Sequence, residues 1–285
     1  MPSDNILINP SEIALSDRSV QYGDASFTTM YCENGAIALF NRHLLRLQAA
    51  CDCLDIHFND WATLQATLST VASERDAPSV IKVLITRGSG GRAYEAPQSQ
   101  TPRCIITTHD AGAMHNASPV NCVKLSTIRL PSHSGLNGVK HTNRLAQVMA
   151  KTQAHALQCD EVLMCDEEQH VIEASSANIF YCLNGAWHTP PLDLYGVQGV
   201  MRDAFIDYLS INDIHVNIAS HHLSQFKKAE HILLSNAVKG IRPVKCLEMD
   251  RKIMLNTELS GLIKPFIKRV LDSSEFMQAC DKAQL

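Results

Sequence analysis

The sequence predicts a two-domain α+β protein, and three observations lead to this prediction. The chain has 285 residues, 45% of them hydrophobic, which is enough to form one large or two modest cores. Segments with strand-like alternation and segments with helical periodicity follow one another along the chain. Residues 109–119 show neither pattern and are mostly small and polar. We therefore expect a small α+β domain at residues 1–112, a linker at 113–120 and a larger domain at 121–285.

The first domain is expected to open with strands. A short strand and turn at residues 6–17 are followed by residues 26–32, which alternate as a strand. Residues 33–35 are typical of a tight turn because Asn and Gly follow one another there. We expect a β-hairpin in which residues 36–40 form the returning strand.

Two helices and two further strands complete the first domain. Asn41 is expected to cap the first helix, and the second helix should run over residues 60–73. The strands are expected at residues 80–86 and 103–108, which are rich in β-branched side chains. Apolar residues one turn apart mark the inner faces: Leu44, Leu47, Cys51 and Leu54 in the first helix, and Trp61, Leu64, Leu68 and Val71 in the second.

The second domain is expected to begin near Val120 and to combine helices with strands. One helix should follow Lys140, another should open after Gly199, and a C-terminal helix at about residues 256–271 should be kinked at Pro265. Apolar residues at helical spacing predict the first two: Leu145, Val148, Met149 and Leu157 after Lys140, and Phe205, Ile206 and Leu209 after Gly199. The expected strands lie at 161–165, on both sides of Glu173, around a turn at 183–185, and at 215–220, 230–236 and 241–247.

Composition argues against several classes of function. A net charge of −4 gives no electrostatic case for binding nucleic acid or an anionic membrane. The ten cysteines lack the spacing of a disulfide framework or a zinc site, which favours buried thiols in a reducing compartment. The histidines show no metal-ligand spacing, so no metal is expected. With no visible signal peptide and no apolar run long enough to span a bilayer, we expect a cytoplasmic protein.

The most informative stretch is GVKHTNRL at residues 138–145. Lys140 lies where a loop leads into a helix, so its amine can face a pocket, although a single lysine is more often a solvated surface charge. A second signal is Glu173, which lies in a run of small residues between two strand-like stretches. An acid in that position needs a cation to face.

Two glycine-containing segments are candidates for ligand binding. Residues 87–94 form a glycine-rich loop that lacks the ending of a P-loop and the spacing of a dinucleotide turn. This loop is either a plain hairpin tip or also part of a substrate pocket, in which case Arg92 suits a carboxylate. Residues 199–202 open a helix, which is either an ordinary helix start or an anion site.

Together these segments resemble the class IV (fold type IV) family of pyridoxal-phosphate enzymes, which includes branched-chain aminotransferases, D-amino-acid aminotransferases and aminodeoxychorismate lyases. In that family a lysine forms a Schiff base with the cofactor, and a glutamate in an E-x-x-x-x-N-[IL]-F run holds the ring nitrogen. Lys140 fits the first, and Glu173 to Phe180, with Asn178, fits the second. The resemblance implies a small α+β domain, a larger β-barrel-like domain with helices, and a homodimer with its active site near the subunit boundary.

The resemblance also implies a phosphate site for pyridoxal 5′-phosphate. Arg46, which would otherwise be read as a surface helix residue, matches the family's phosphate-binding arginine. The helix start and a further turn match segments that contact the phosphate in the family. These implied ligands are Gly199, Val200 and Met201 in the helix start, and Ser235 and Asn236 in the turn.

Residues 22–29, 87–94 and 138–145 are most similar to the lyase branch of the family. The implied reaction is elimination of pyruvate from 4-amino-4-deoxychorismate, which leaves 4-aminobenzoate, a folate precursor. Lys140 would transfer the proton. Thr29 would orient or protonate the leaving group, or be an ordinary strand residue, and Arg92 and Tyr94 would line the substrate pocket. The alternatives are a D-amino-acid or branched-chain transaminase, or a cofactor-binding protein without activity.

Overall fold

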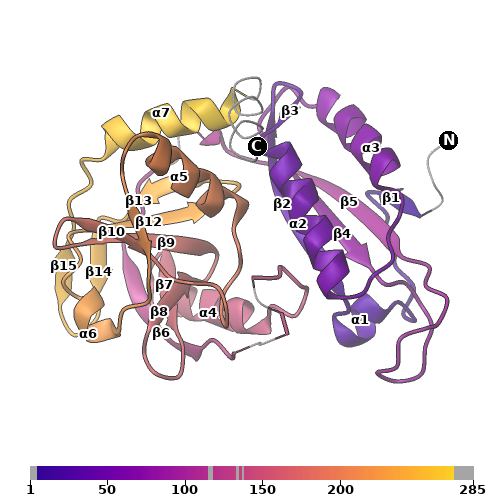
Figure 1. Cartoon of the computed structure of the whole chain (residues 1–285), viewed down its shortest axis with the longest axis horizontal. Coiled ribbons are helices and arrows are strands. Elements are labelled where there is room, and N and C mark those ends of the chain that lie inside the picture. Colours follow the sequence, from indigo (N-terminus) through magenta and orange to yellow (C-terminus); the bar gives the residue numbers. More distant parts are fainter. Residues whose placement is uncertain (1–4, 115–117, 133–134, 137, 273–285) are drawn as a thin grey trace. The chain divides into compact units, whose positions relative to one another are not determined.

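Figure 1 shows a computed structural model of the chain, which describes residues 5–114, 118–132, 135–136 and 138–272. The described chain separates into two compact units. Unit 1 comprises the described residues of Met1–Ala113, Val139–Asn143 and Val270–Leu285, and unit 2 those of Met114–Gly138 and Arg144–Arg269. Lys140 thus packs within unit 1, whereas the expected division assigns it to the second domain. Residues 115–117 of the expected linker lie outside the described residues.

Unit 1 is built on a five-stranded sheet in the order β1-β5-β4-β2-β3. Its strands are β1 (Ile6–Ile8), β2 (Ala25–Glu33), β3 (Ala36–Ile37), β4 (Ser79–Thr86) and β5 (Arg103–Asp110). The strands expected at 26–32, 80–86 and 103–108 are confirmed. The returning strand at 36–40 is wrong in its extent, because β3 ends at Ile37 and a helix begins at Phe40.

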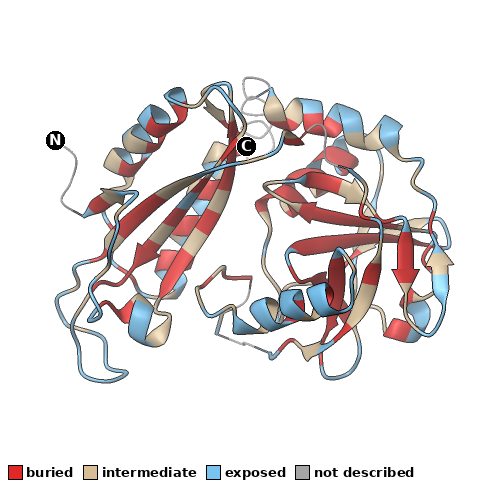
Figure 2. Cartoon of the chain, turned by 180° about the vertical axis from the view of Figure 1, so that it is seen from behind, coloured by how far each residue is buried: buried red, intermediate tan, exposed pale blue. Residues whose placement is uncertain are grey.

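The helices of unit 1 are α1 (Arg18–Tyr22), α2 (Phe40–Cys53) and α3 (Trp61–Ser73). The predicted inner faces of α2 and α3 are confirmed, since they pack into one apolar core with the sheet (Figure 2). The prediction that Asn41 caps α2 is wrong. The helix starts at Phe40, two residues earlier than a cap at Asn41 would allow, and its cap position is the apolar Leu39, which has a left-handed φ of 56°.

The sheet of unit 1 has two chemically different faces. Thr28 pairs with Val83 across β2 and β4 on the face that the helices cover. Because side chains alternate along a strand, Phe27, Thr29 and Lys82 project from the opposite face. These three residues are half-buried or exposed, in contrast to the fully buried Thr28.

Unit 2 contains a ten-stranded sheet that branches at β9, where the sequence analysis expected a barrel-like domain. β9 pairs with β8, β10 and β12. The strands are β6 (Val123–Arg129), β7 (Glu161–Cys165), β8 (Val171–Ala174), β9 (Ala177–Leu183), β10 (Ala186–Thr189), β11 (Val216–Ile218), β12 (His231–Asn236), β13 (Gly240–Pro243), β14 (Cys246–Glu248) and β15 (Lys252–Met254).

The single strand expected at 241–247 is wrong, because the segment divides between two partners. β13 pairs with β12, whereas β14 pairs with β6 and β15. Pro243 lies at the division, and a proline has no N–H to continue the ladder.

The remaining helices are α4 (Leu145–Ala156), α5 (Val200–Ile211), α6 (Leu223–Phe226) and α7 (Ser260–Leu271). α4 packs against the rest of unit 2 through the small residues Ala150 and Ala154. Its large apolar residues Leu145, Val148 and Met149 are 70%, 59% and 48% exposed. α7 begins later than expected and contains Pro265; the kink there stays a prediction. None of the described helices is both long and apolar enough to cross a membrane.

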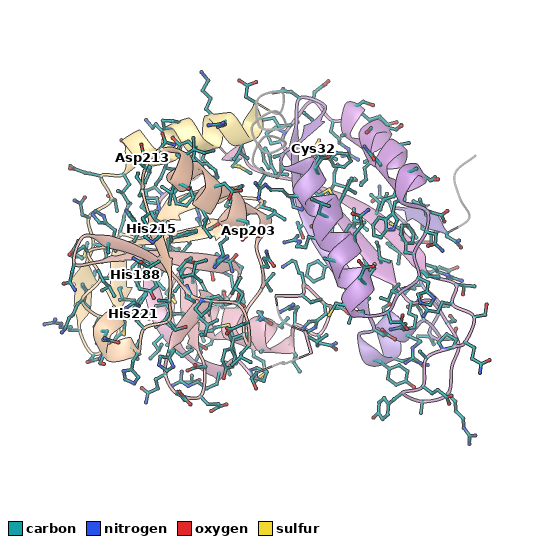
Figure 3. All side chains as sticks on the ribbon, in the orientation of Figure 1. Cys32, His188, Asp203, Asp213, His215 and His221 are labelled. Carbon is teal, nitrogen blue, oxygen red and sulfur yellow. The ribbon has the colours of Figure 1, made fainter. Side chains whose placement is uncertain are left out.

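The described cysteines are free thiols, and most of them are buried. Cys32, labelled in Figure 3, lies in the core of unit 1, where its thiol donates to the Ala72 carbonyl at 3.9 Å. Burial raises the pKa of Cys104 to about 12. These thiols therefore act as small apolar side chains, as the sequence predicts. Cys280 lies outside the described residues.

Candidate active site

The segment that carries Lys140 is anchored along β2. The backbone N–H of Phe27 and the hydroxyl of Ser26 both donate to the Lys140 carbonyl, at 3.0 and 3.1 Å. The N–H of Thr142 donates to the Ala25 carbonyl at 3.0 Å, and its hydroxyl donates to the Gly23 carbonyl at 2.7 Å. The backbone is therefore held at Lys140 itself and two residues beyond it, which fixes the origin of its side chain.

The amine of Lys140 lies over an aromatic ring on the face of the sheet away from the helices. Its Nζ is 4.6 Å from the centroid of Phe27, and the Nζ of Lys82 is 4.9 Å from the same centroid. Lys82 lies directly opposite Thr29 in the ladder of β2 and β4. Lys140, Lys82 and Thr29 thus share one face of unit 1.

Lys82 was not among the residues predicted from the sequence. The available signal was a single charged residue in the middle of the apolar run 80–86. Alternation in a strand puts such a residue on the face that the core does not use.

Arg46 is held on the other face through Thr28 and His43. A guanidinium Nη2 of Arg46 donates to the Thr28 hydroxyl oxygen. The Thr28 hydroxyl is 2.6 Å from His43 Nδ1, and because it accepts from Arg46, its own proton goes to that nitrogen. Burial, with the positive charges of Arg46 and Lys140, holds the pKa of His43 well below its usual range. His43 is therefore a neutral acceptor that orients Thr28 toward Arg46.

Arg92 and Tyr94 lie on the loop that follows β4. Both are exposed, and the Tyr94 ring packs edge-on against Tyr22 with 5.6 Å between centroids. The backbone of Arg92 pairs with Glu95 within the loop. Their role in substrate binding stays a prediction.

In unit 2, three of the predicted residues form a row across adjacent strands. Glu173 in β8 pairs with Asn178 in β9, and Asn178 pairs with Ser235 in β12. Paired residues on neighbouring strands project from the same face of a sheet. The sheet register therefore brings Glu173, Asn178 and Ser235 together, although about sixty residues separate the first from the last.

Glu173 is buried and held at both oxygens. Oε2 accepts from the Val197 N–H at 3.1 Å, and Oε1 accepts from Gln147 Nε2 at 3.3 Å. Burial lowers the pKa of Arg144, and the negative charge of Glu173 partly opposes this shift. The sequence predicted a cation for Glu173 but did not identify Arg144 or Gln147. Their spacing of three residues at the start of α4 was the available signal.

The start of α5 forms a small cradle beside this row. Asn178 Nδ2 donates to the Val197 carbonyl at 2.8 Å. Gly199 is the cap residue of α5, and without a side chain it leaves the first N–H groups of the helix without a side-chain acceptor. The hydroxyl of Ser235 is buried and has no hydrogen-bond partner among the described residues. Within the described part of the chain, these are hydrogen-bond donors without a side-chain acceptor, as an anion site requires.

Asn236 acts differently from Ser235. Its Oδ1 accepts from the N–H groups of Val238 and Lys239, and its Nδ2 donates to the Ser176 carbonyl. Its side chain shapes the turn after β12, so its expected contact with a phosphate stays a prediction.

Gly199→Ala should lower the free energy of unfolding by about 1–3 kcal/mol, the usual cost of overpacking. A Cβ at Gly199 would lie 2.0 Å from Asn178 Oδ1, so one of the two segments must move. Gly261→Ala is the control, because nothing lies within 4 Å of a Cβ in that helical position. That change should be neutral or stabilise by about 0.5–1 kcal/mol. Urea unfolding of both variants measures the difference, and equal stability would contradict the tight fit at Gly199.

The chain is similar to several known proteins. The model of a family described as class IV amino-transferases matches residues 25–247. An aminodeoxychorismate lyase from Vibrio harveyi is 32% identical over 236 residues, which cover 82% of this chain and 87% of the relative. A crystal structure of 4-amino-4-deoxychorismate lyase from Pseudomonas aeruginosa has a TM-score of 0.83 at 29% identity, with 92% of this chain and 97% of that chain covered. A D-alanine aminotransferase from Listeria innocua is 23% identical, with 83% of this chain and 82% of the relative covered.

Proposed function

Since the chain belongs to the class IV amino-transferase family, we propose that it is a 4-amino-4-deoxychorismate lyase that uses pyridoxal 5′-phosphate. The observation that carries the proposal is its identity of 32% to a lyase over most of both chains, against 23% to an aminotransferase. The enzyme converts 4-amino-4-deoxychorismate into 4-aminobenzoate and pyruvate. The free thiols support a reducing compartment, and we place the enzyme in the cytoplasm.

The described residues fit this cofactor. The buried Ser235 hydroxyl and the first N–H groups of α5 offer donors to a phosphate, and Arg46 offers a cation. Glu173 offers a buried carboxylate to the ring nitrogen, and Asn178 holds the Val197 carbonyl beside it. Lys140 would hold the cofactor covalently through Nζ, from a backbone fixed on β2.

When bound, pyridoxal phosphate supplies an electron sink for negative charge next to the substrate nitrogen. Lys140 Nζ takes the proton from the ring carbon that bears the amino group. The neighbouring enolpyruvyl group then leaves with the electron pair of its C–O bond, and the ring becomes aromatic. The proton ends on the released pyruvate, so the atoms of the substrate are divided between the two products without water.

Lys82 and Thr29 support this assignment on the same face as Lys140. The substrate carries two carboxylates, and Lys82 is an exposed cation that no described carboxylate pairs with at ion-pair distance. We assign Lys82, with Arg92, to these carboxylates. We also assign Thr29, which lies opposite Lys82, to the orientation of the leaving group.

The decisive assay supplies 4-amino-4-deoxychorismate to the cofactor-loaded protein and measures both products. Release of 4-aminobenzoate and pyruvate in equal amounts establishes the lyase. The second candidate is a D-amino-acid or branched-chain transaminase, which the similarity to D-alanine aminotransferase favours. Amino-group exchange between D-alanine or leucine and a keto acid, without release of 4-aminobenzoate, would replace the lyase by a transaminase.

The exposed apolar residues of α4 support a homodimer. Leu145, Val148 and Met149 recur one turn apart on one face, and such a contiguous apolar face is typical of an interface. Val148→Glu should weaken the dimer by about 100-fold or more, because a two-fold interface would bury the unpaired charge twice. Ile218→Glu, an equally exposed position on β11, is the control. Sedimentation velocity measures both, and a Val148→Glu protein that dimerises like the wild type would contradict this interface.

A further inference from the structure

The loop between β4 and β5 contains several residues with a left-handed backbone conformation. Gly88, Gly90 and Gly91 have φ values of 83°, 113° and 80°, and Ala93 has a φ of 52°. A Cβ at Gly88 would lie 2.1 Å from the Thr101 carbonyl oxygen, and one at Gly91 would lie 2.1 Å from that of Glu95. The loop is therefore tightly folded, with its carbonyl groups turned inward.

These carbonyl groups converge on the guanidinium of Arg18, which is almost fully buried. Nη1 donates to the carbonyl oxygens of Gly90, Ala93 and Glu95 at 3.3, 3.1 and 3.2 Å, and Nη2 donates to that of Tyr94 at 3.2 Å. One planar cation thus donates to four carbonyl groups of the loop, of which that of Glu95 also accepts from the Arg92 N–H.

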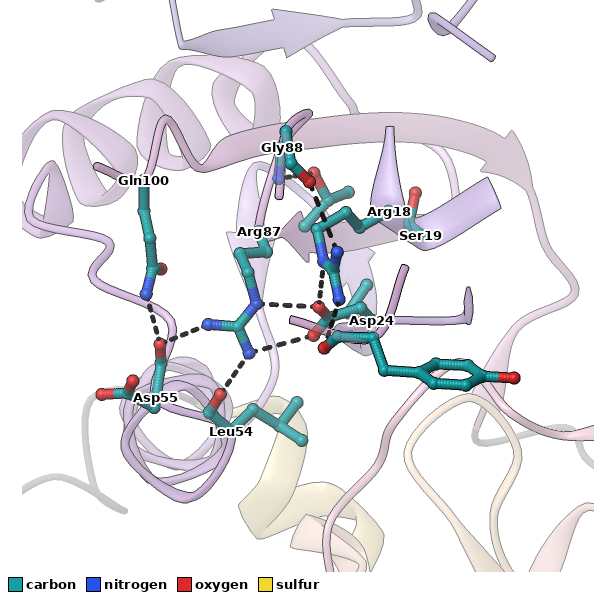
Figure 4. A network of polar contacts seen from close by, with 12 residues as sticks. Arg18, Ser19, Asp24, Leu54, Asp55, Arg87, Gly88 and Gln100 are labelled. Carbon is teal, nitrogen blue, oxygen red and sulfur yellow. Dashed lines mark hydrogen bonds and ion pairs between the residues drawn. The ribbon is translucent and has the colours of Figure 1, made fainter. Parts of the chain in front are cut away.

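Arg18 is itself held by Asp24, and Asp24 is held in turn by Arg87 (Figure 4). Asp24 Oδ2 accepts from Arg18 Nε at 2.8 Å and from Arg87 Nε at 2.7 Å. Burial raises the pKa of Asp24, but the hydrogen bonds and charges of the two arginines outweigh it, so the pKa lies below its ordinary value. Arg87 also donates to the carbonyl oxygens of Leu54 and Asp55. The network is anchored to the end of α2.

The same short segment also holds the lysine. Asp24 lies between Gly23 and Ala25, whose carbonyl oxygens accept from Thr142. The start of β2 therefore holds two segments. Gly23 and Ala25 hold the segment of Lys140, and Asp24 holds the loop 88–95 through Arg18.

We propose that Arg18, held by Asp24, is the positioning residue of the loop 88–95 and thereby sets the affinity of the enzyme for its dicarboxylate substrate. This inference rests on the proposed function, in which Arg92 and Tyr94 contact the substrate. Arg18 acts by fixing the backbone from which these two side chains project. It touches neither the cofactor nor the reacting atoms.

The kinetic test uses Arg18→Met and Arg18→Lys. Arg18→Met should raise the KM for 4-amino-4-deoxychorismate about 10-fold or more and leave kcat within about threefold, because the lost contacts concern substrate binding. Arg18→Lys keeps the charge but not the planar fork, so its KM should be intermediate. Arg75→Met is the matched control, since Arg75 also bonds within unit 1, to Thr108, but does not touch the loop. An unchanged KM in Arg18→Met, or an equal rise in Arg75→Met, overturns the proposal.

The second readout does not depend on activity. Arg92 is exposed, so trypsin can cut the Arg92–Ala93 bond once the loop opens. Cleavage there should be about 10-fold faster in Arg18→Met than in the wild type and unchanged in Arg75→Met, because local opening controls the rate. If Arg18→Met does not fold, Arg18→Lys decides the matter by the same two measurements.

The outcomes separate the two proposals. A wild type that releases no 4-aminobenzoate removes the proposed function, and proteolysis then decides alone whether Arg18 positions the loop. Faster cleavage with an unchanged KM shows a loop that does not bind the substrate, which overturns the inference and leaves the lyase intact.

Discussion

Lys140→Arg should lower kcat for 4-aminobenzoate release by about 10⁴-fold or more, because a single residue supplies both the covalent nitrogen and the general base. An arginine keeps the positive charge over Phe27 but neither forms the covalent link nor gives up its proton near neutral pH. The fold should survive, since the contacts that anchor the segment to β2 at Lys140 are made by its carbonyl oxygen.

Two measurements check this result. The first is the rate of release of 4-aminobenzoate, and the second is mass mapping after borohydride reduction, which should attach the cofactor at residue 140 in the wild type only. Lys227→Arg is the control, because Lys227 forms an exposed ion pair with Asp250 away from the site. Borohydride labelling of another lysine in the wild type would contradict the assignment of Lys140.

Glu173→Gln should lower kcat by about 10²–10³-fold, the usual effect of removing one preorganised electrostatic partner. The amide oxygen of glutamine can still accept from the Val197 N–H, so the side chain should stay in place. It carries no charge, however, and cannot keep a proton on the ring nitrogen of the cofactor. Glu173→Asp, which retains the charge on a shorter side chain, should recover part of the activity.

Glu161→Gln separates the charge effect from a loss of stability. Glu161 is equally buried in the neighbouring strand β7 and accepts from the hydroxyl groups of Ser175 and Ser176. Its replacement should lower the melting temperature but leave the absorbance of the bound cofactor unchanged. Glu173→Gln, in contrast, should shift this absorbance. A Glu173→Gln enzyme within threefold of the wild-type kcat would contradict the proposed role.

The elements that local chemistry specifies were predictable from the sequence. The strands at 26–32, 80–86 and 103–108 and the inner faces of α2 and α3 follow from the spacing of apolar residues, which is a property of neighbours in the chain. The resemblance likewise identified Lys140, Glu173 and Ser235, because the motifs that carry them are continuous. The sequence alone thus determined the class of fold, the family and the candidate residues.

The tertiary structure decided what depends on residues far apart in the chain. The division of the segment 241–247 into β13 and β14 depends on which strand each half pairs with. The row from Glu173 to Ser235 depends on the register of β8, β9 and β12, and the place of Lys82 opposite Thr29 depends on the register of β2 and β4. Arg18 meets a loop more than seventy residues away. Local periodicity carries no information about such pairings, because the free energy that selects them comes from contacts formed only when the chain is folded.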